Sequence, residues 1–187
     1  MKQANNQTQT IQVLYELALS IGTSLDLQQM LNVSMEAFAE KLGCAVSTAY
    51  RCQTSQTDCQ FEAVGSNKPT VDKAETAQMA LAHLPTTADE QQMAQFVATL
   101  PLVDQGAADD YYHLLDLPGF GVLLLIKDEA PLDEKMLEAI RPLQDKLATA
   151  ANACLVQEAP PIARGQSRAI LESITTPLLI SRISDGL

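Results

Sequence analysis

The chain has 187 residues, of which 47% are hydrophobic and 19% are charged. This length suits one compact domain with some excess, and the composition is typical of a globular protein rather than a disordered one. The net charge is -11, and no cluster of Lys or Arg interrupts it, which argues against nucleic acid as a direct partner. No apolar run is long enough for a membrane span and no signal core follows the polar N-terminus, so a cytoplasmic protein is expected.

The four cysteines show no Cys-x-x-Cys spacing and have no neighbouring histidine, so no metal site is predicted. Cys44 and Cys154 fall among apolar neighbours and are expected to be small buried side chains. Cys52 and Cys59 bracket a polar loop. A disulfide across this loop is sterically possible but is not favoured in a reducing cytosol.

Residues 1–8 are expected to form a polar leader before the first apolar pattern. Apolar residues then recur at three- and four-residue steps over residues 11–21, which predicts a helix that ends at Gly22. Asp26 is placed to cap a second helix that ends at Gly43. The link is so short that the chain either turns sharply or runs on nearly straight, and the sequence does not choose between these.

Two strands are predicted over residues 44–52 and 61–65, because small and branched side chains there lack a helical period. Helical patterns follow over residues 73–84 and 88–100. Each of them ends at a proline, which disfavours the helical conformation of the residue before it. A polar turn over residues 104–110 then leads into the next strand pair.

The stretch from Tyr111 to Lys127 has two apolar runs on either side of Pro-Gly-Phe-Gly, which is turn chemistry. We therefore predict a hairpin. Its second arm, Val122 to Ile126, is uninterrupted and rich in branched side chains. This arm is expected to be buried on both faces and to form the central strand of the sheet.

A long helix is expected from Pro131 to Gln157, with a kink or local unwinding at Pro142. Its apolar residues alternate at four- and three-residue steps, as in the seam of a coiled coil. Two interpretations stay open, because this face either packs on the domain's own sheet or joins two copies of the chain as a dimer helix. The seam consists of Met136, Ile140, Leu143, Leu147 and Cys154.

The C-terminal part of the chain reads as a new segment. Residues 158–166 have the Pro and Gly content of a linker. Residues 167–187 suit a short amphipathic helix, a strand-like run and an Asp-Gly turn whose second arm is absent. Because a strand without a partner is marginal, we expect the chain to continue into a further domain.

The order of these elements over residues 9–157 resembles the GAF domain, a small-molecule-sensing module of bacterial signalling proteins. The most specific match is GFGVLLLIKDEAPLDEKMLEAIRPLQDKLATAANACL, which is similar to that family's final strand, acidic-proline loop and closing helix. The opening, LYELALSIGTSLDLQQMLNVSMEAFAEKLGC, is also typical. The resemblance implies an α+β fold with a central antiparallel sheet, helices packed on it and long terminal helices. Residues 167–187 are similar to the start of a PAS domain.

Together these resemblances imply a regulatory piece of a multidomain sensor, such as a histidine kinase of a two-component system or a cyclic-di-GMP enzyme. The module would not itself be an enzyme. It would bind an unidentified small molecule, form a homodimer through its terminal helices and act on downstream signalling domains. The Asn-Lys-Phe-Asp-type signature of cyclic-nucleotide-binding members is absent, as are the Cys-His pair and Asp-Ile-Pro motif of bilin-binding members, so neither ligand is expected. No cofactor is assigned.

In this family the ligand lies between the sheet and the helices or loops after the first hairpin, which implicates residues 71–112. His113 could bond a ligand oxygen or ligate haem iron, although a satisfied structural histidine is the more usual role. His83 could equally serve the C-terminal dipole of its helix, and core packing explains the aromatic residues as readily as a cavity wall does. The candidate pocket residues are Tyr50, Phe61, His83, Tyr111, Tyr112 and His113.

Two other functions stay open. One branch of the GAF family reduces free methionine sulfoxide with closely placed cysteines, and Cys52 and Cys59 invite that comparison. Against it, no cysteine stands in residues 71–112, where the resemblance places the nucleophile. The other alternative is a ligand-free dimerisation scaffold with a collapsed pocket, which the apolar residues between Val71 and Leu100 permit.

Overall fold

The structure is a computed structural model that describes residues 2–55, 58–68, 70, 74–87 and 89–158. The PAS-like segment predicted over residues 167–187 lies outside the described residues, as does the predicted linker except for Glu158.

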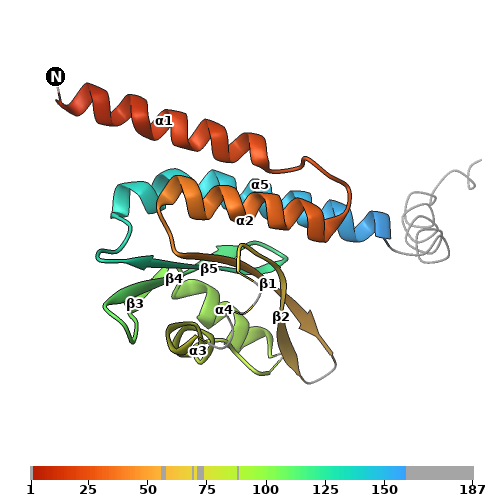
Figure 1. Cartoon of the computed structure of the whole chain (residues 1–187). Coiled ribbons are helices and arrows are strands. Elements are labelled where there is room, and N and C mark those ends of the chain that lie inside the picture. Colours follow the sequence, from red (N-terminus) through yellow and green to blue (C-terminus); the bar gives the residue numbers. More distant parts are fainter. Residues whose placement is uncertain (1, 56–57, 69, 71–73, 88, 159–187) are drawn as a thin grey trace, which may run out of the picture.

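The described residues form one five-stranded antiparallel sheet with helices on both faces (Figure 1). The strand order across the sheet is β2-β1-β5-β4-β3. The strands are β1 (Val46–Thr54), β2 (Cys59–Ser66), β3 (Leu102–Gln105), β4 (Asp110–Leu117) and β5 (Gly121–Asp128). The helices are α1 (Lys2–Ser20), α2 (Leu27–Leu42), α3 (Glu75–Leu81), α4 (Glu90–Ala98) and α5 (Glu134–Glu158).

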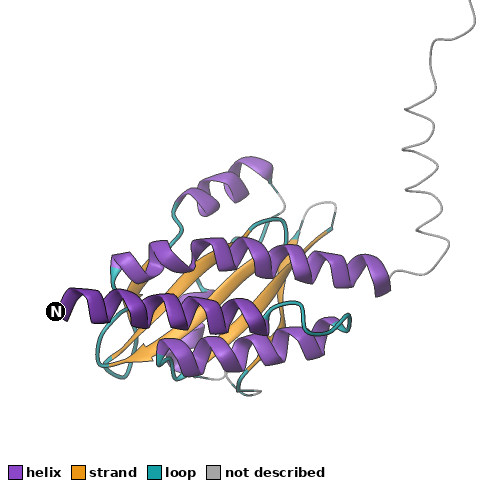
Figure 2. Ribbon diagram, turned by 90° about the horizontal axis from the view of Figure 1, so that it is seen from above, coloured by secondary structure: helices purple, strands orange, loops and turns teal. Residues whose placement is uncertain are grey.

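The helices divide into three layers around the sheet. Helices α2 and α5 cover one face, and α1 packs on the outer side of these two helices rather than on the sheet (Figures 1 and 2). Helices α3 and α4 lie on the opposite face (Figure 1). No helix in the described part of the chain is both long enough and apolar enough to cross a lipid bilayer.

The predicted hairpin and its central strand are confirmed. Strands β4 and β5 pair in register from Asp110 opposite Asp128 to Leu117 opposite Gly121. Strand β5 also pairs with β1, so it lies in the middle of the sheet. Its residues 122–126 are all buried because helices cover both faces of the sheet at this position.

The two N-terminal helices are also confirmed, and the chain turns sharply between them so that α1 and α2 lie side by side (Figure 1). The carboxylate of Asp26 caps α2 by accepting a hydrogen bond from the Gln29 N–H at 2.7 Å. Gly43 ends α2 at φ 64°, where a side chain would be strained. Helix α1 begins at Lys2, so the expected polar leader is part of this helix and does not precede it.

Polar contacts join residues 146–158 of α5 to the end of α1, the turn after it and the start of α2. The carboxylate of Glu158 accepts a hydrogen bond from the Leu27 N–H at 3.1 Å. The ammonium of Lys146 donates to the Ala18 carbonyl near the end of α1. The thiol of Cys154 lies 3.7 Å from the Ser24 carbonyl. These contacts hold the second half of α5 to the end of α1 and the start of α2.

The apolar seam predicted on α5 packs against other parts of the same chain. Ile140, Leu143, Leu147 and Cys154 are buried in the core between the sheet and the helices, and Met136 packs against this core. These side chains therefore do not form an exposed dimer seam, and the packing of this face on the domain's own fold is what the structure shows. The seam is buried because α5 lies between the sheet and α1, so that its apolar face is covered by other parts of the same domain.

Four of the predicted elements need correction. The segment read as a polar turn over residues 104–110 begins within strand β3, where Gln105 pairs with Tyr111. As an edge strand β3 can form from mostly exposed side chains, so it lacks an apolar signature. Helices α3 and α4 are shorter than their patterns predicted. Helix α5 continues unbroken through Pro142, whose ring is exposed to solvent.

Candidate functional site

The layer of α3 and α4 is packed far less completely than the layer of α2 and α5. Helix α3 buries Thr76, Ala77 and Ala80, whereas α4 buries none of its residues. The best-defined contact of α4 with the sheet is an edge-to-face pair between Phe96 and Phe61 on β2, with ring centroids 6.5 Å apart. Helix α4 therefore leaves open space beside the sheet.

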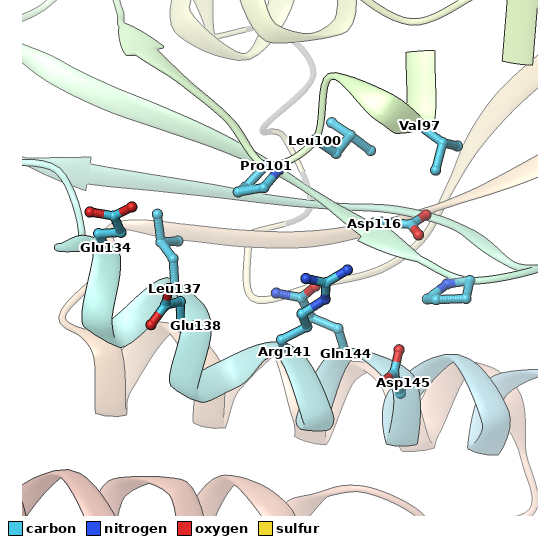
Figure 3. A pocket seen from close by; sticks show the side chains of 11 residues that line it. Val97, Leu100, Pro101, Asp116, Glu134, Leu137, Glu138, Arg141, Gln144 and Asp145 are labelled. Carbon is cyan, nitrogen blue, oxygen red and sulfur yellow. The ribbon is translucent and has the colours of Figure 1, made fainter. Parts of the chain in front are cut away.

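One cleft of about 360 Å³ lies between the end of α4, the second half of β4 and α5 (Figure 3). It exists because β3 is short, since the pairing of β3 with β4 begins with Leu102 opposite Leu114. Among the described residues, no strand pairs with residues 115–117 of β4 on that side, and the side chains of Leu100 and Pro101 approach this edge instead. The opposite wall is formed by α5 (Figure 3).

The charged and amide side chains that line this cleft are Asp116, Glu134, Glu138, Arg141, Gln144 and Asp145. Asp116 projects from β4, and Arg141 and Gln144 project from α5 (Figure 3). Gln144 is only 7% exposed. The side chains of Asp116, Arg141 and Gln144 have no hydrogen-bond or ion-pair partner among the described residues. An amide and a guanidinium that have no protein partners can bond to a bound molecule without first breaking protein contacts.

The charge of Asp116 is poorly stabilised by its surroundings. Burial raises the pKa of this carboxyl group, the nearby Asp145 raises it further, and Arg141 opposes the shift. A cationic group of a bound molecule would favour the ionised form of Asp116.

A second cleft of about 240 Å³ adjoins the first and shares Val97 and Asp116 with it. Its walls come from α4, β1, β2 and the turn between β4 and β5, and they include Phe61, Phe96 and Cys52. The two clefts together form a groove along α4 that is polar at the α5 end and mostly apolar at the β2 end.

Four of the predicted pocket residues lie on the α3 and α4 face of the sheet. Tyr50 and Tyr112 are buried in its core, and Phe61 packs against that core. The ring Nε2 of His83 and the Tyr112 hydroxyl lie 2.8 Å apart, which joins the end of α3 to β4. Of these four residues only Phe61 lines either of the two clefts.

The other two candidates, Tyr111 and His113, do not join this group, because successive side chains of a strand point to opposite faces. His113 is fully buried on the α5 side, where its Nε2 accepts a hydrogen bond from the Leu132 N–H at 2.9 Å. Its Nδ1 has no partner among the described residues that meets hydrogen-bond geometry. Burial lowers the pKa of this imidazole, although the backbone of Leu125 partly opposes the shift. The neutral ring thus serves as an acceptor for the loop before α5.

Two of the cleft residues are marked by a polar residue type at a position of the sequence where the pattern assigns an apolar one. Asp116 interrupts an otherwise apolar stretch of β4, and Gln144 stands among the apolar residues of α5. A polar residue at a position that the pattern assigns to the core either has a partner or lines a cavity. Arg141 gave no such signal, since a charged residue on a helix usually faces solvent.

The cysteines behave in two ways. Cys44 and Cys154 are buried in the α2 and α5 layer, as predicted. Cys52 and Cys59 lie on neighbouring strands, and their sulfur atoms are 2.6 Å apart although the thiols are not joined. Among the described residues no group of three or more candidate ligands could hold a metal ion.

Comparisons with known proteins bear on the fold. No family model matches the chain, and no curated protein matches it. The GAF domain of a phosphoenolpyruvate-protein phosphotransferase from Acinetobacter superposes with a TM-score of 0.50 at 11% identity, covering 81% of this chain and 96% of that one. The GAF domain of a phosphoenolpyruvate-protein phosphotransferase from Coxiella burnetii gives a TM-score of 0.50 at 9% identity, covering 88% and 99%. Because identities this low show likeness of fold alone, the conclusion is that the chain has a GAF-like α+β fold.

Proposed function

We propose that this chain is a regulatory module of a cytoplasmic signal-transduction protein, such as a sensor histidine kinase or a cyclic-di-GMP enzyme. It binds a small molecule, forms a homodimer and carries out no chemistry of its own. The GAF-like fold supports this assignment, because the family resemblance of the sequence implies small-molecule sensing.

The observation that carries the proposal is that α5 forms one wall of the first cleft. Arg141 and Gln144 lie on the cleft side of this helix (Figure 3). The same helix runs to Glu158, where the described part of the chain ends. A molecule in the cleft therefore contacts the element that leads out of the domain, and its differential binding to two positions of α5 would shift their populations.

The polar groups of the cleft suit a small zwitterion such as an amino acid. The guanidinium of Arg141 can bind a carboxylate with two parallel hydrogen bonds. The carboxylates of Asp116 and Asp145 can accept hydrogen bonds from an ammonium group, and the amide of Gln144 can bond to either end. Apolar side chains such as Leu137 line the same cleft and can pack against a side chain of the ligand.

Calorimetric titration with a panel of free L-amino acids tests this assignment. One or more members of the panel should bind, and Arg141→Ala should weaken binding by about tenfold or more, because a lost charged hydrogen bond is worth about 1.5–3 kcal/mol. Lys135→Ala is the matched control, since it removes a positive charge from α5 outside the cleft. The proposed ligand class is wrong if no amino acid binds, or if binding survives Arg141→Ala unchanged.

The dimer is assigned to the outer surface of α1 rather than to the α5 seam. Helix α1 has an inward apolar stripe that includes the buried Leu17. It also has an outward stripe, where Ile11, Tyr15 and Leu19 recur at four-residue steps and are 66%, 63% and 59% exposed. A helix with apolar residues on both sides is typical of one that packs on two partners, and a second copy of the chain supplies the second partner.

Light scattering over a range of concentrations tests the dimer. The parent protein should be dimeric, and Leu19→Glu should give a folded monomer, because the charge would have to be buried at the interface. Gln12→Glu places a charge on an exposed position of the same helix outside the stripe and should leave the dimer intact. A monomeric parent, or a dimer that tolerates Leu19→Glu, would contradict this part of the proposal.

A second candidate function is a thiol enzyme of the free methionine sulfoxide reductase type. The observation that favours it is the distance of 2.6 Å between the sulfur atoms of Cys52 and Cys59. Cys52 also lines the second cleft, so a substrate there would meet a thiol. Measurable turnover of free methionine sulfoxide that Cys52→Ser abolishes would establish this function and overturn the non-catalytic one.

A further inference from the structure

The Cys52 and Cys59 pair is a feature that the sensing proposal does not use. The two residues lie on adjacent antiparallel strands, where Cys52 pairs with Phe61 and Cys59 pairs with Thr54. They are therefore diagonal neighbours across the β1 and β2 ladder, and their sulfur atoms are 2.6 Å apart. A disulfide bond is about 2.05 Å long, so a small displacement of the two side chains would join them.

Backbone contacts hold both cysteines in position. The N–H of Cys52 donates to the Phe120 carbonyl at 2.9 Å, in the turn between β4 and β5. The N–H of Cys59 donates to the Thr86 carbonyl at 3.0 Å, in the segment before α4. The pair is thus fixed by two contacts outside its own hairpin, and the two thiols do not need a folding event to meet.

The two thiols differ in accessibility, which assigns them different roles. Cys52 is partly exposed and lines the second cleft, whereas Cys59 is only 4% exposed. Burial, followed by the neighbouring Cys52, raises the pKa of the Cys59 thiol to about 12. A small oxidant entering the cleft therefore reaches Cys52 first, and Cys59 is placed to resolve the oxidised product.

We propose that Cys52 and Cys59 form a redox-modification site that is reversibly converted to a disulfide by a small hydroperoxide. The Cys52 thiolate attacks the peroxide, so that an S–O bond forms, the O–O bond breaks and an alcohol or water leaves with a proton. The Cys59 sulfur then attacks the Cys52 sulfenic acid, so that the S–S bond forms and the hydroxyl group leaves as water. Two thiols and one hydroperoxide give one disulfide, one water and one alcohol or second water. Two molecules of a small thiol reverse the change by exchange.

This site is compatible with a reducing compartment, because the pair rests as two thiols and is oxidised only when peroxide is present. Its position gives the modification a consequence for the domain. The disulfide would tie β1 to β2 at the wall of the second cleft, beside Phe61 and Phe96. The oxidation state of the pair would then alter the apolar end of the groove along α4.

Thiol counting on the full chain tests the proposal. The reduced, desalted protein is treated with hydrogen peroxide in slight excess, quenched, and titrated with a thiol reagent under denaturing conditions. Two of the four thiols should be lost and should return after treatment with a small thiol. No Lys or Arg separates the two cysteines, so one tryptic peptide that begins at Cys52 should carry the loss of two hydrogen atoms.

Variants separate the two roles. In Cys59→Ser a sulfenic acid should be trapped at Cys52 by a dimedone-type reagent, whereas Cys52→Ser should keep its thiols at the same peroxide dose. Cys44→Ser and Cys154→Ser are the matched controls, and both should still lose two thiols. The proposal is overturned if all four thiols survive, if Cys52 is oxidised to sulfinic acid without forming the bond, or if the disulfide joins two chains. These readouts need no amino-acid ligand, so they succeed or fail independently of the cleft assignment.

Discussion

The two faces of the sheet are covered by helices of different kinds. On the face of α2 and α5, large apolar side chains such as Leu31, Phe38 and Leu147 are fully buried. The chain approaches itself there so closely that a Cβ on Gly65 of β2 would overlap the side chain of Leu31. On the other face α3 buries only small side chains and α4 buries none. The first face secures the fold, and the second leaves room for a ligand.

Polar side chains in the molecule likewise fall into two kinds: some are bonded within the fold, and others are free to bond to another molecule. The buried histidine of the dense face has its Nε2 bonded to the Leu132 N–H. Arg141 and Gln144 also belong to α5, but they line the cleft at the edge of the sheet and have no side-chain partners among the described residues. Stability and binding can therefore be altered by different substitutions.

The largest expected effect is on the dense face. Leu147→Ala should lower the free energy of unfolding by about 2–5 kcal/mol, because the fully buried side chain would leave a cavity. Chemical denaturation measures this change. Leu19→Ala removes the same side chain from the exposed surface of α1 and should change monomer stability by about 0.5 kcal/mol or less. Equal effects of the two substitutions would contradict the assignment of buried and exposed stripes.

His113 gives the next largest effect and a pH dependence. His113→Leu leaves the buried Leu132 N–H without an acceptor and should cost about 1–3 kcal/mol. His113→Gln is the matched variant, because its side-chain oxygen can take the place of Nε2.

The sign of the pH dependence follows from the lowered pKa of folded His113. Its stabilising contribution is complete above the unfolded pKa of about 6.5 and is lost as the pH falls below that value, since the unfolded chain binds the proton more readily. The parent should therefore lose stability relative to His113→Gln between neutral and mildly acidic pH. Parallel stability curves for the two proteins would show that the imidazole is not held neutral.

A smaller effect is expected on the loose face. Phe96→Ala removes the edge-to-face contact with Phe61 and should cost about 1 kcal/mol. Hydrogen exchange should become faster in α4 while that in α2 and α5 stays unchanged, because α4 has little else to hold it. A loss comparable with that of Leu147→Ala would mean that α4 is part of the main cooperative core.

The smallest effect has the opposite sign. Asp116→Asn should raise stability at neutral pH by about 0.5 kcal/mol, because it removes a half-buried carboxylate that lacks a partner. Since the pKa of folded Asp116 is raised, the cost of this carboxylate grows as the pH rises through the folded pKa and is absent below about 3.8. The two denaturation midpoints should therefore converge in acid. A less stable Asp116→Asn variant at neutral pH would show that the carboxylate has a stabilising partner.

The sequence was sufficient for most of the fold because the relevant signals are local. Asp26 and Gly43 mark the ends of α2, and the apolar run of β5 indicates a strand covered on both faces. Strand β3 was missed, since the backbone of an edge strand pairs without an apolar pattern in its side chains. A periodic pattern of apolar residues shows that one face of a helix is buried, but it does not show what buries that face. The α5 seam was therefore compatible with a dimer, whereas in the structure it packs in the domain's own core.

The candidate site was less predictable from the sequence, because it depends on the exact residues at which strands and helices end. The first cleft arises from the short length of β3, and its polar groups come from β4 and α5, which are distant in the sequence. Aromatic residues were reasonable candidates for a cavity wall, but Tyr50 and Tyr112 are used to fill the core under α3. Of the predicted pocket residues, Phe61 alone lines either of the two clefts beside α4 in the described part of the chain.

The contacts that join α5 to α1 and α2 have a mechanical consequence. Glu158 binds the first turn of α2 and Lys146 binds the last turn of α1, so a rotation or shift of α5 would have to carry both neighbours with it. In the proposed dimer, the outward stripe of α1 would then change its angle relative to the second copy of the chain. Occupancy of the cleft could in this way be read as a change of geometry between two protomers, without any rearrangement inside the sheet.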